Sequence, residues 1–206
     1  MINKVATRRQ NILKSVCLGE CQSKDLPSEL DLSSIAAGMN RLWQRSIRNL
    51  RHGVVNELGA TLVWQRGRLR LTNIVQGESN TVALKPQIHR GQKFVGTFHT
   101  HPYKQGWLGI AFSGEDFATA INLRENVSIV HAGNKIAALI RTEISSHSVD
   151  SNKIVDLANE LVWRYSNKQT PFAEAVRKMN IDLCVAYGLA YYLGETDGQI
   201  TLRQKP

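Results

Sequence analysis

Two short stretches carry most of the information about the fold of this chain: FVGTFHTHP at residues 94–102 and SGED at residues 113–116. The first is an apolar run of strand-forming residues, and Pro102 predicts where that strand ends. Residues i and i+2 of a strand point to the same face, so we expect the imidazoles of His99 and His101 to converge. The second stretch predicts a helix that is capped by Ser113 and carries Asp116 in its first turn.

These residue types and spacings are typical of a catalytic zinc site. Zinc accepts histidine nitrogens, and a catalytic site has three protein ligands and one open position. The helix dipole favours a carboxylate in the first turn, and the short side chain of Asp116 can face back toward the strand end. Two neutral imidazoles and one carboxylate leave the ion with net positive charge, which is what activates water. We therefore expect one Zn²⁺ per chain, bound by His99, His101 and Asp116.

Each of these features also has an ordinary structural interpretation. A His-x-His pair on a strand is commonly a polar face or a hydrogen-bonded core pair. Ser113 with Asp116 forms a capping box that needs no metal. Glu57, in the apolar segment 54–64, could form a salt bridge with one of the many arginines. Taken singly, these interpretations are the commoner ones; taken jointly and in this order, the residues favour a metal site.

The order of these motifs resembles the JAMM (MPN+) metalloprotease motif, which has a distant Glu, then His-x-His-Pro, then Ser-x-x-Asp. Here the matching residues are Glu57-Leu58-Gly59, residues 99–102 and residues 113–116, and the resemblance covers about residues 40–145. The family includes deubiquitinating subunits of the proteasome lid and the signalosome, and bacterial relatives that act on ubiquitin-like proteins. The resemblance implies an α+β fold, sandwich-like in its α/β/α layers. Its sheet would be mixed and mostly antiparallel, as in the MPN/JAB and cytidine-deaminase-like proteins.

The resemblance also implies a role for each matching residue. His99, His101 and Asp116 would bind zinc, Glu57 would take a proton from the activated water, and Ser113 would hydrogen-bond the oxyanion. The spacer 102–112 is longer than in eukaryotic members of the family. Trp107-Leu108 within it resembles an aromatic-Leu pair that precedes the serine in lid-type enzymes, so we expect Trp107 to contribute to substrate binding.

The activity implied is that of a zinc metallopeptidase or isopeptidase that cleaves after the C-terminal glycine of a ubiquitin-like protein. The partners implied are that protein or its conjugate, together with activating and conjugating enzymes. The alternative is a non-catalytic MPN-type interaction module that uses its C-terminal helices for assembly. The ligand set argues against it, because inactive MPN modules typically lack these residues.

The remaining sequence predicts three regions: a polar segment at 1–30, the metalloprotease core at 31–147 and a helical extension at 148–206 that packs on the core. In the core, periodicity predicts a helix from about residue 31 to 52 and a helix over 113–123. It predicts strands over 54–64, 68–72, 81–84, 94–99, 128–130 and 136–141. In the extension it predicts helical stripes over 154–165 and 172–187. The apolar run Cys184–Leu193 is interpreted as buried helix.

Composition limits the function classes further. The net charge is +9, from 26 Lys and Arg against 17 Asp and Glu. The basic residues are scattered and not interleaved with aromatic residues, so we interpret them as a solvated face and expect no nucleic-acid partner. Three cysteines are too few for a disulfide framework. No apolar run approaches the roughly 18 residues of a membrane span, and the first residues lack the apolar segment of a secretory signal. We therefore expect no membrane partner and a cytoplasmic location.

Overall fold

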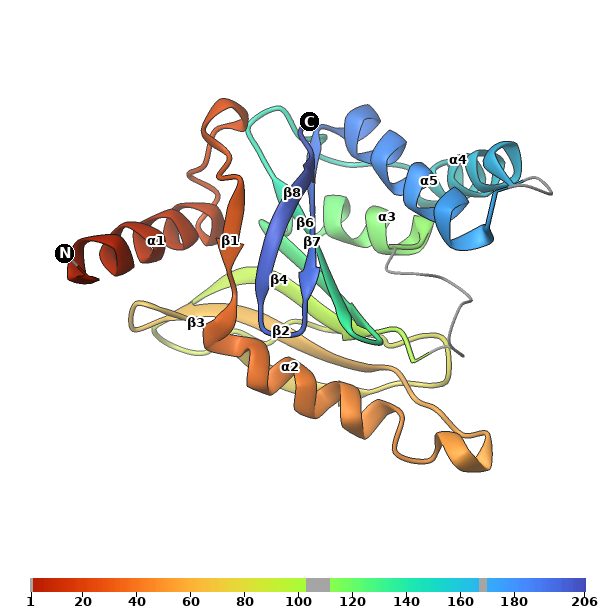
Figure 1. Cartoon of the computed structure of the whole chain (residues 1–206), viewed down its shortest axis with the longest axis horizontal. Helices are drawn as coiled ribbons and strands as arrows, with labels where there is room; N and C mark the ends of the chain where they lie inside the picture. Colours follow the sequence, from red (N-terminus) through yellow and green to blue (C-terminus); the bar gives the residue numbers. More distant parts are fainter. Residues whose placement is uncertain (1, 103–111, 167–169) are drawn as a thin grey trace.

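The chain forms an α+β fold, which a computed structural model describes over residues 2–102, 112–166 and 170–206, without the side chains of residues 2–6 and 8. These ranges contain five α-helices and one curled, mostly antiparallel sheet of eight strands (Figure 1). The helices are α1 (Ile2–Cys17), α2 (Ser33–Ser46), α3 (Gly114–Asn122), α4 (Ser151–Tyr165) and α5 (Phe172–Tyr187). The strands are β1 (Glu29–Asp31), β2 (Leu58–Gln65), β3 (Arg68–Gln76), β4 (Gln92–Thr100), β5 (Val127–Ala132), β6 (Lys135–Arg141), β7 (Leu189–Glu195) and β8 (Gln199–Gln204). None of the helices in the described ranges is long and apolar enough to cross a membrane.

The order of the strands places β4 inside the sheet, third from the edge formed by β3. They run β1-β8-β7-β6-β5-β4-β2-β3, and among the described strands only the β4–β5 pair is parallel. A parallel pair needs a crossover connection, and here the crossover contains α3. The N-terminus of α3 lies near the carboxyl end of β4, because Asp116 in the first turn of α3 is 3.1 Å from His99 of β4.

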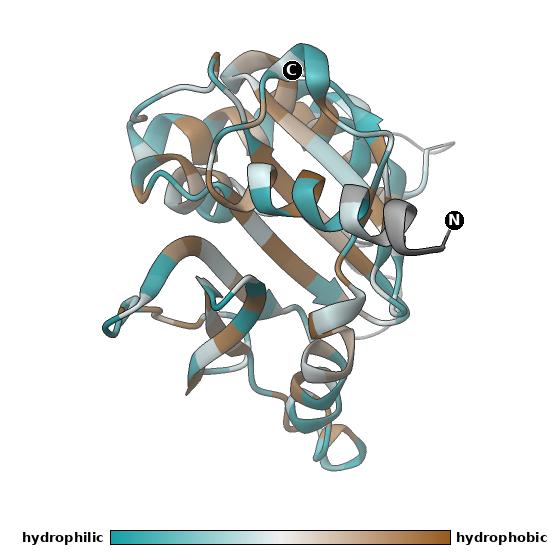
Figure 2. Ribbon diagram, turned by 90° about the vertical axis from the view of Figure 1, so that its left-hand side faces the viewer, coloured by the Kyte–Doolittle hydropathy of each residue, from teal (hydrophilic) through white to brown (hydrophobic). Residues whose placement is uncertain are grey.

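The sheet separates two hydrophobic clusters because successive side chains of a strand point to opposite faces. On β6, Ile136, Ala138 and Ile140 join the cluster that contains buried residues of α1 and α2. Ala137 and Leu139 join the second cluster, which lies beneath α3, α4 and α5. Apolar stretches accordingly lie on the central strands, and the helices alternate between apolar and polar segments (Figure 2). The result is a sheet with helices on both faces.

The C-terminal region differs from the helical extension predicted for residues 148–206. The run Cys184–Leu193, predicted to be a buried helix, is divided at Gly188: α5 ends there and β7 begins. Gly188 has a left-handed backbone (φ 68°), and a Cβ at this position would lie 2.6 Å from the carbonyl oxygen of Ile144. The two strands that follow enter the sheet, β7 beside β6 and β8 beside β1. This region therefore completes the sheet in addition to covering it.

Other segments also differ from their predicted secondary structure. The helix predicted over 31–52 ends at Ser46, and the strand predicted over 54–64 begins at Leu58, so Glu57 precedes the strand. Within the predicted polar segment 1–30, residues 2–17 form α1, which buries Leu13, Val16 and Cys17. Residues 81–84, predicted to be a short strand, form none. The three cysteines are buried free thiols, in keeping with the predicted lack of a disulfide framework.

Candidate metal centre

The carboxyl end of β4 positions the two histidines. His99 pairs with Val130 of β5 and with Gly59 of β2, and it lies one residue before the end of β4. The pairing continues beyond the strand, because the backbone N–H of His101 donates to the carbonyl of His131 (2.9 Å). Both imidazoles project from the same face of the sheet, and both residues are buried, at 7% and 5% exposure.

The N-terminal turn of α3 positions the carboxylate. The hydroxyl of Ser113 accepts from the backbone N–H of Asp116 (3.1 Å), and the backbone N–H of Ser113 donates to Asp116 Oδ2 (2.7 Å). Together these bonds form a complete capping box. The cap fixes the carboxylate at the helix end, where Oδ1 faces His99 and the capped Oδ2 faces His101.

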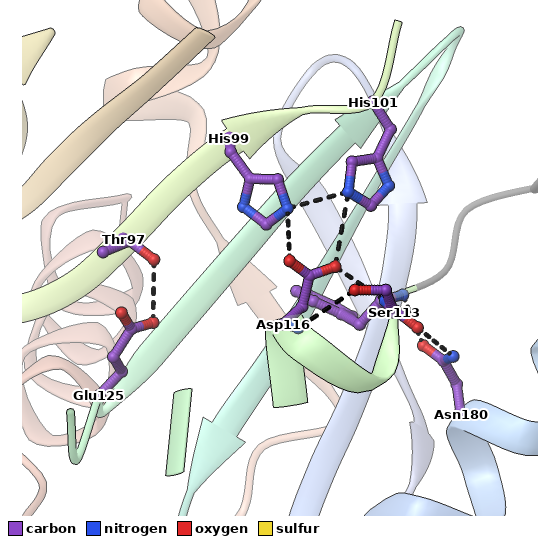
Figure 3. A network of polar contacts seen from close by, with 8 residues as sticks. Thr97, His99, His101, Ser113, Asp116, Glu125 and Asn180 are labelled. Carbon is purple, nitrogen blue, oxygen red and sulfur yellow. Dashed lines mark hydrogen bonds and ion pairs between the residues drawn. The ribbon is translucent and has the colours of Figure 1, made fainter. Parts of the chain in front are cut away.

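The three side chains converge on one point (Figure 3). The two Nε2 atoms of His99 and His101 are 2.9 Å apart. Asp116 Oδ1 lies 3.1 Å from the first, and Asp116 Oδ2 lies 3.5 Å from the second. Tetrahedral ligands at about 2.0–2.1 Å from zinc lie roughly 3.3 Å from one another, so the spacing fits a single small ion. This buried His-His-Asp group could therefore bind a metal ion.

Asp116 is charged at neutral pH, which favours a bound cation, whereas the raised pKa of His99 means that a metal ion must compete with a proton at this imidazole. Burial opposes the protonated imidazole of His99, but the charge and hydrogen bond of Asp116, together with the charges of Glu57 and Glu125, outweigh burial and raise the pKa of His99. Burial also opposes ionisation of Asp116, yet the two histidines hold the pKa of this carboxyl well below its usual range. Asp116 is therefore an anionic carboxylate at neutral pH, which is the form that binds a cation.

Glu57 lies on the same side of the sheet as the histidines. It immediately precedes β2 and is 3% exposed. Gly59 pairs with His99 in the antiparallel β2–β4 ladder, so extension of this register by two residues places Glu57 opposite His101. The backbone N–H of Leu58 donates to Thr100 Oγ1 (3.0 Å), which supports this register at the strand ends. The charge of Glu57 also contributes to the raised pKa of His99.

Two buried polar residues near the group were not singled out from the sequence. Glu125 precedes β5, is 3% exposed and accepts a hydrogen bond from Thr97 Oγ1 (3.0 Å). Its charge acts on His99. Asn180 lies on α5, is fully buried and pairs with the backbone of Phe112, the residue before Ser113. The sequence signal for both was a polar residue next to apolar ones. Glu125 comes shortly before the mostly apolar segment 127–132, and Asn180 lies within the apolar helical stripe Val176–Leu183.

The structure thus brings together five of the residues singled out from the sequence, at one end of β4. These are Glu57, His99, His101, Ser113 and Asp116. The sixth, Trp107, lies outside the described residues. Comparisons with family models, with curated proteins and with solved structures found no match for this chain.

Proposed function

We propose that this chain is a zinc-dependent hydrolase of the JAMM (MPN+) type, with the MPN/JAB fold, that cleaves after the C-terminal glycine of a ubiquitin-like protein. The observation that carries the proposal is the convergence of His99, His101 and Asp116, whose donor atoms lie within 4.8 Å of one another. A plain capping box would account for Asp116 but not for two buried imidazoles directed at its carboxylate. The order of the motifs along the chain supports the same reading.

The chain's own residues have distinct tasks in the proposed reaction. Zinc, when held by His99, His101 and Asp116, supplies Lewis-acid activation of water and of the scissile carbonyl. Glu57 takes a proton from the attacking water and passes it to the leaving nitrogen. Ser113 donates its hydroxyl hydrogen to the oxyanion, which is possible because its oxygen acts as acceptor, not donor, toward the N–H of Asp116.

The proposed substrate follows from the same resemblance. The tail of a ubiquitin-like protein usually ends in Gly-Gly, and a narrow groove that brings main chain close to main chain accepts glycine where a side chain would clash. The leaving amine is a lysine side chain or an extension of the modifier. Activating and conjugating enzymes are the expected partners of such a protein.

The first test is the metal content of purified protein after stripping and reloading with zinc. We expect one zinc per wild-type chain and per Glu57→Gln chain, and loss of zinc in His101→Ala and Asp116→Ala. His52→Ala, which removes an exposed histidine outside the group, is the matched control and should keep its zinc. A wild-type chain that takes up no zinc would refute the proposal.

The second test is hydrolysis of a linear fusion in which a ubiquitin-like protein ending in Gly-Gly precedes a reporter. Glu57→Gln should retain zinc but lose activity by about 10²–10⁴-fold, because a general base is removed and a ligand is not. Replacement of the terminal glycine of the fusion by a bulky residue should abolish cleavage. Equal cleavage of both fusions would indicate a general zinc peptidase without specificity for the terminal glycine. Zinc binding without any cleavage would favour the non-catalytic interaction module.

A further inference from the structure

Asn180 of α5 makes a two-point contact with the backbone that leads into the site. Phe112 N–H donates to Asn180 Oδ1 (2.8 Å), and Asn180 Nδ2 donates to the Phe112 carbonyl oxygen (2.9 Å). The amide side chain thereby pairs with both backbone groups of one residue, as a neighbouring antiparallel strand would. Asn180 is fully buried, and an unpaired amide in this environment is strongly unfavourable. The contact therefore fixes the position of Phe112 with respect to α5.

Phe112 is joined by its peptide bond to Ser113, which caps the helix that carries Asp116. Phe112 precedes Ser113, whose backbone N–H donates to Asp116 Oδ2 (2.7 Å). The same oxygen lies 3.5 Å from His101 Nε2. The Phe112 ring is also fully buried and packs edge-on against Phe117 of α3 (6.1 Å between ring centroids). A displacement at Phe112 would therefore move the cap and the carboxylate together.

The other C-terminal helix, α4, contacts the opposite side of the same turn. Gly114, the first residue of α3, packs so closely on α4 that a Cβ on it would lie 2.8 Å from Val155 Cα and 3.1 Å from Ala158 Cβ. Ser113 thus lies between Phe112, which is bound to α5, and Gly114, which rests on α4. Both flanking contacts come from the region that follows the motif in sequence.

We propose that Asn180 is a positioning residue: through Phe112 and the Ser113 cap it sets the distance of the Asp116 carboxylate from His99 and His101. On this view α4 and α5 are part of the scaffold of the metal site and not a separable attachment. The predicted effect of Asn180 on metal binding rests on the proposed function. Its predicted effect on the Ser113 cap does not, because the cap exists with or without a bound ion.

The test compares Asn180→Leu, which removes both hydrogen bonds at similar volume, with Thr142→Val. The latter is a matched control, because it removes another buried bond from a side chain to a backbone carbonyl, that of Thr142 to Gly188 at the end of α5 (3.1 Å). In the metal-free protein, hydrogen exchange at the backbone N–H groups of Ser113 and Asp116 should accelerate in Asn180→Leu and stay unchanged in Thr142→Val. Asn180→Ser serves as the second variant if Asn180→Leu does not fold.

The second readout is cobalt(II), bound in place of zinc and followed by its visible absorption. Asn180→Leu should weaken cobalt affinity by about 10–100-fold and shift the band, as expected when support of a ligand is lost. Thr142→Val should lower only the melting temperature. Wild-type protein that binds no cobalt would count against the proposed function, and hydrogen exchange alone would then decide the role of Asn180. The inference would be overturned if the backbone N–H groups of Ser113 and Asp116 exchanged at the same rate in the Asn180 variants as in the wild type.

Discussion

Replacement of Glu125 by Gln should stabilise the metal-free protein at alkaline pH and have little effect at acidic pH. Burial raises the pKa of the Glu125 carboxyl from 4.5 to about 7, against the opposing effects of Thr97, Ser128 and nearby His99. Because the pKa is higher in the folded protein than in the unfolded chain, protonation of Glu125 stabilises the fold. This stabilisation is fully present below the unfolded pKa of 4.5 and is lost as the pH rises through about 7. At 1.36 kcal/mol per pKa unit, the contribution lost is roughly 3 kcal/mol, a large share of the stability of a domain.

The assay is urea unfolding of chelator-treated wild type and Glu125→Gln at several pH values between 4 and 8. The variant should match the wild type near pH 4 and exceed it by up to roughly 3 kcal/mol at pH 8, because it carries no buried charge. Glu143→Gln is a control of opposite sign. Two hydrogen bonds from Ser23 (both 2.7 Å) lower the pKa of Glu143. Loss of the Glu143 carboxylate should therefore destabilise the fold at neutral pH and not at acidic pH. A constant difference between Glu125→Gln and wild type across the pH range would refute the reasoning.

Three further substitutions test the neighbourhood of the site. Ser113→Ala should reduce turnover of the fusion substrate by about 10²–10³-fold, because it removes an oxyanion donor. It should also lower the free energy of unfolding by about 1 kcal/mol, because it removes a helix cap. Unchanged turnover would exclude Ser113 as an oxyanion donor. Gly114→Ala should lower the urea midpoint by the equivalent of about 1–3 kcal/mol, because its Cβ would lie 2.8 Å from Val155 Cα, and an unchanged midpoint would contradict that close contact. Trp107→Ala should raise KM with zinc content intact, and an unaltered KM would remove Trp107 from substrate binding.

Two parts of the metal-binding group could be predicted from local geometry, and their approach to each other was implied by the resemblance to the JAMM motif. The i, i+2 period of a strand aligns His99 with His101, and a capping box fixes Asp116 relative to Ser113. Asn180 is different: its partner Phe112 lies 68 positions away, and no local period relates the two. Such long-range contacts depend on how helices dock on the sheet, which sequence patterns alone do not specify.

The same distinction explains which elements of the fold were predicted correctly. Strands β4, β5 and β6 and helices α3 to α5 have clear periods and lie close to their predicted positions, whereas α2 ends six residues before its predicted end and β2 begins four residues after its predicted start. The run Cys184–Leu193 was not predicted correctly, because a short apolar run fits a buried helix and a buried strand equally well. Gly188 is the residue that separates the two, and its left-handed conformation marks the end of α5.

The edge pair β1–β8 has a consequence for how the molecule assembles during synthesis. Leu30 of β1 pairs with Ile200 of β8, so roughly ten to thirty seconds separate the emergence of these strands at about 5–20 residues per second. Until then the apolar side chain of Leu30, which ends up 2% exposed, has no sheet to pack in. Pairing over such a sequence separation also slows refolding of the whole chain. The helices that support Ser113 are synthesised late as well, so the metal-binding group can reach its final geometry only after most of the chain has left the ribosome.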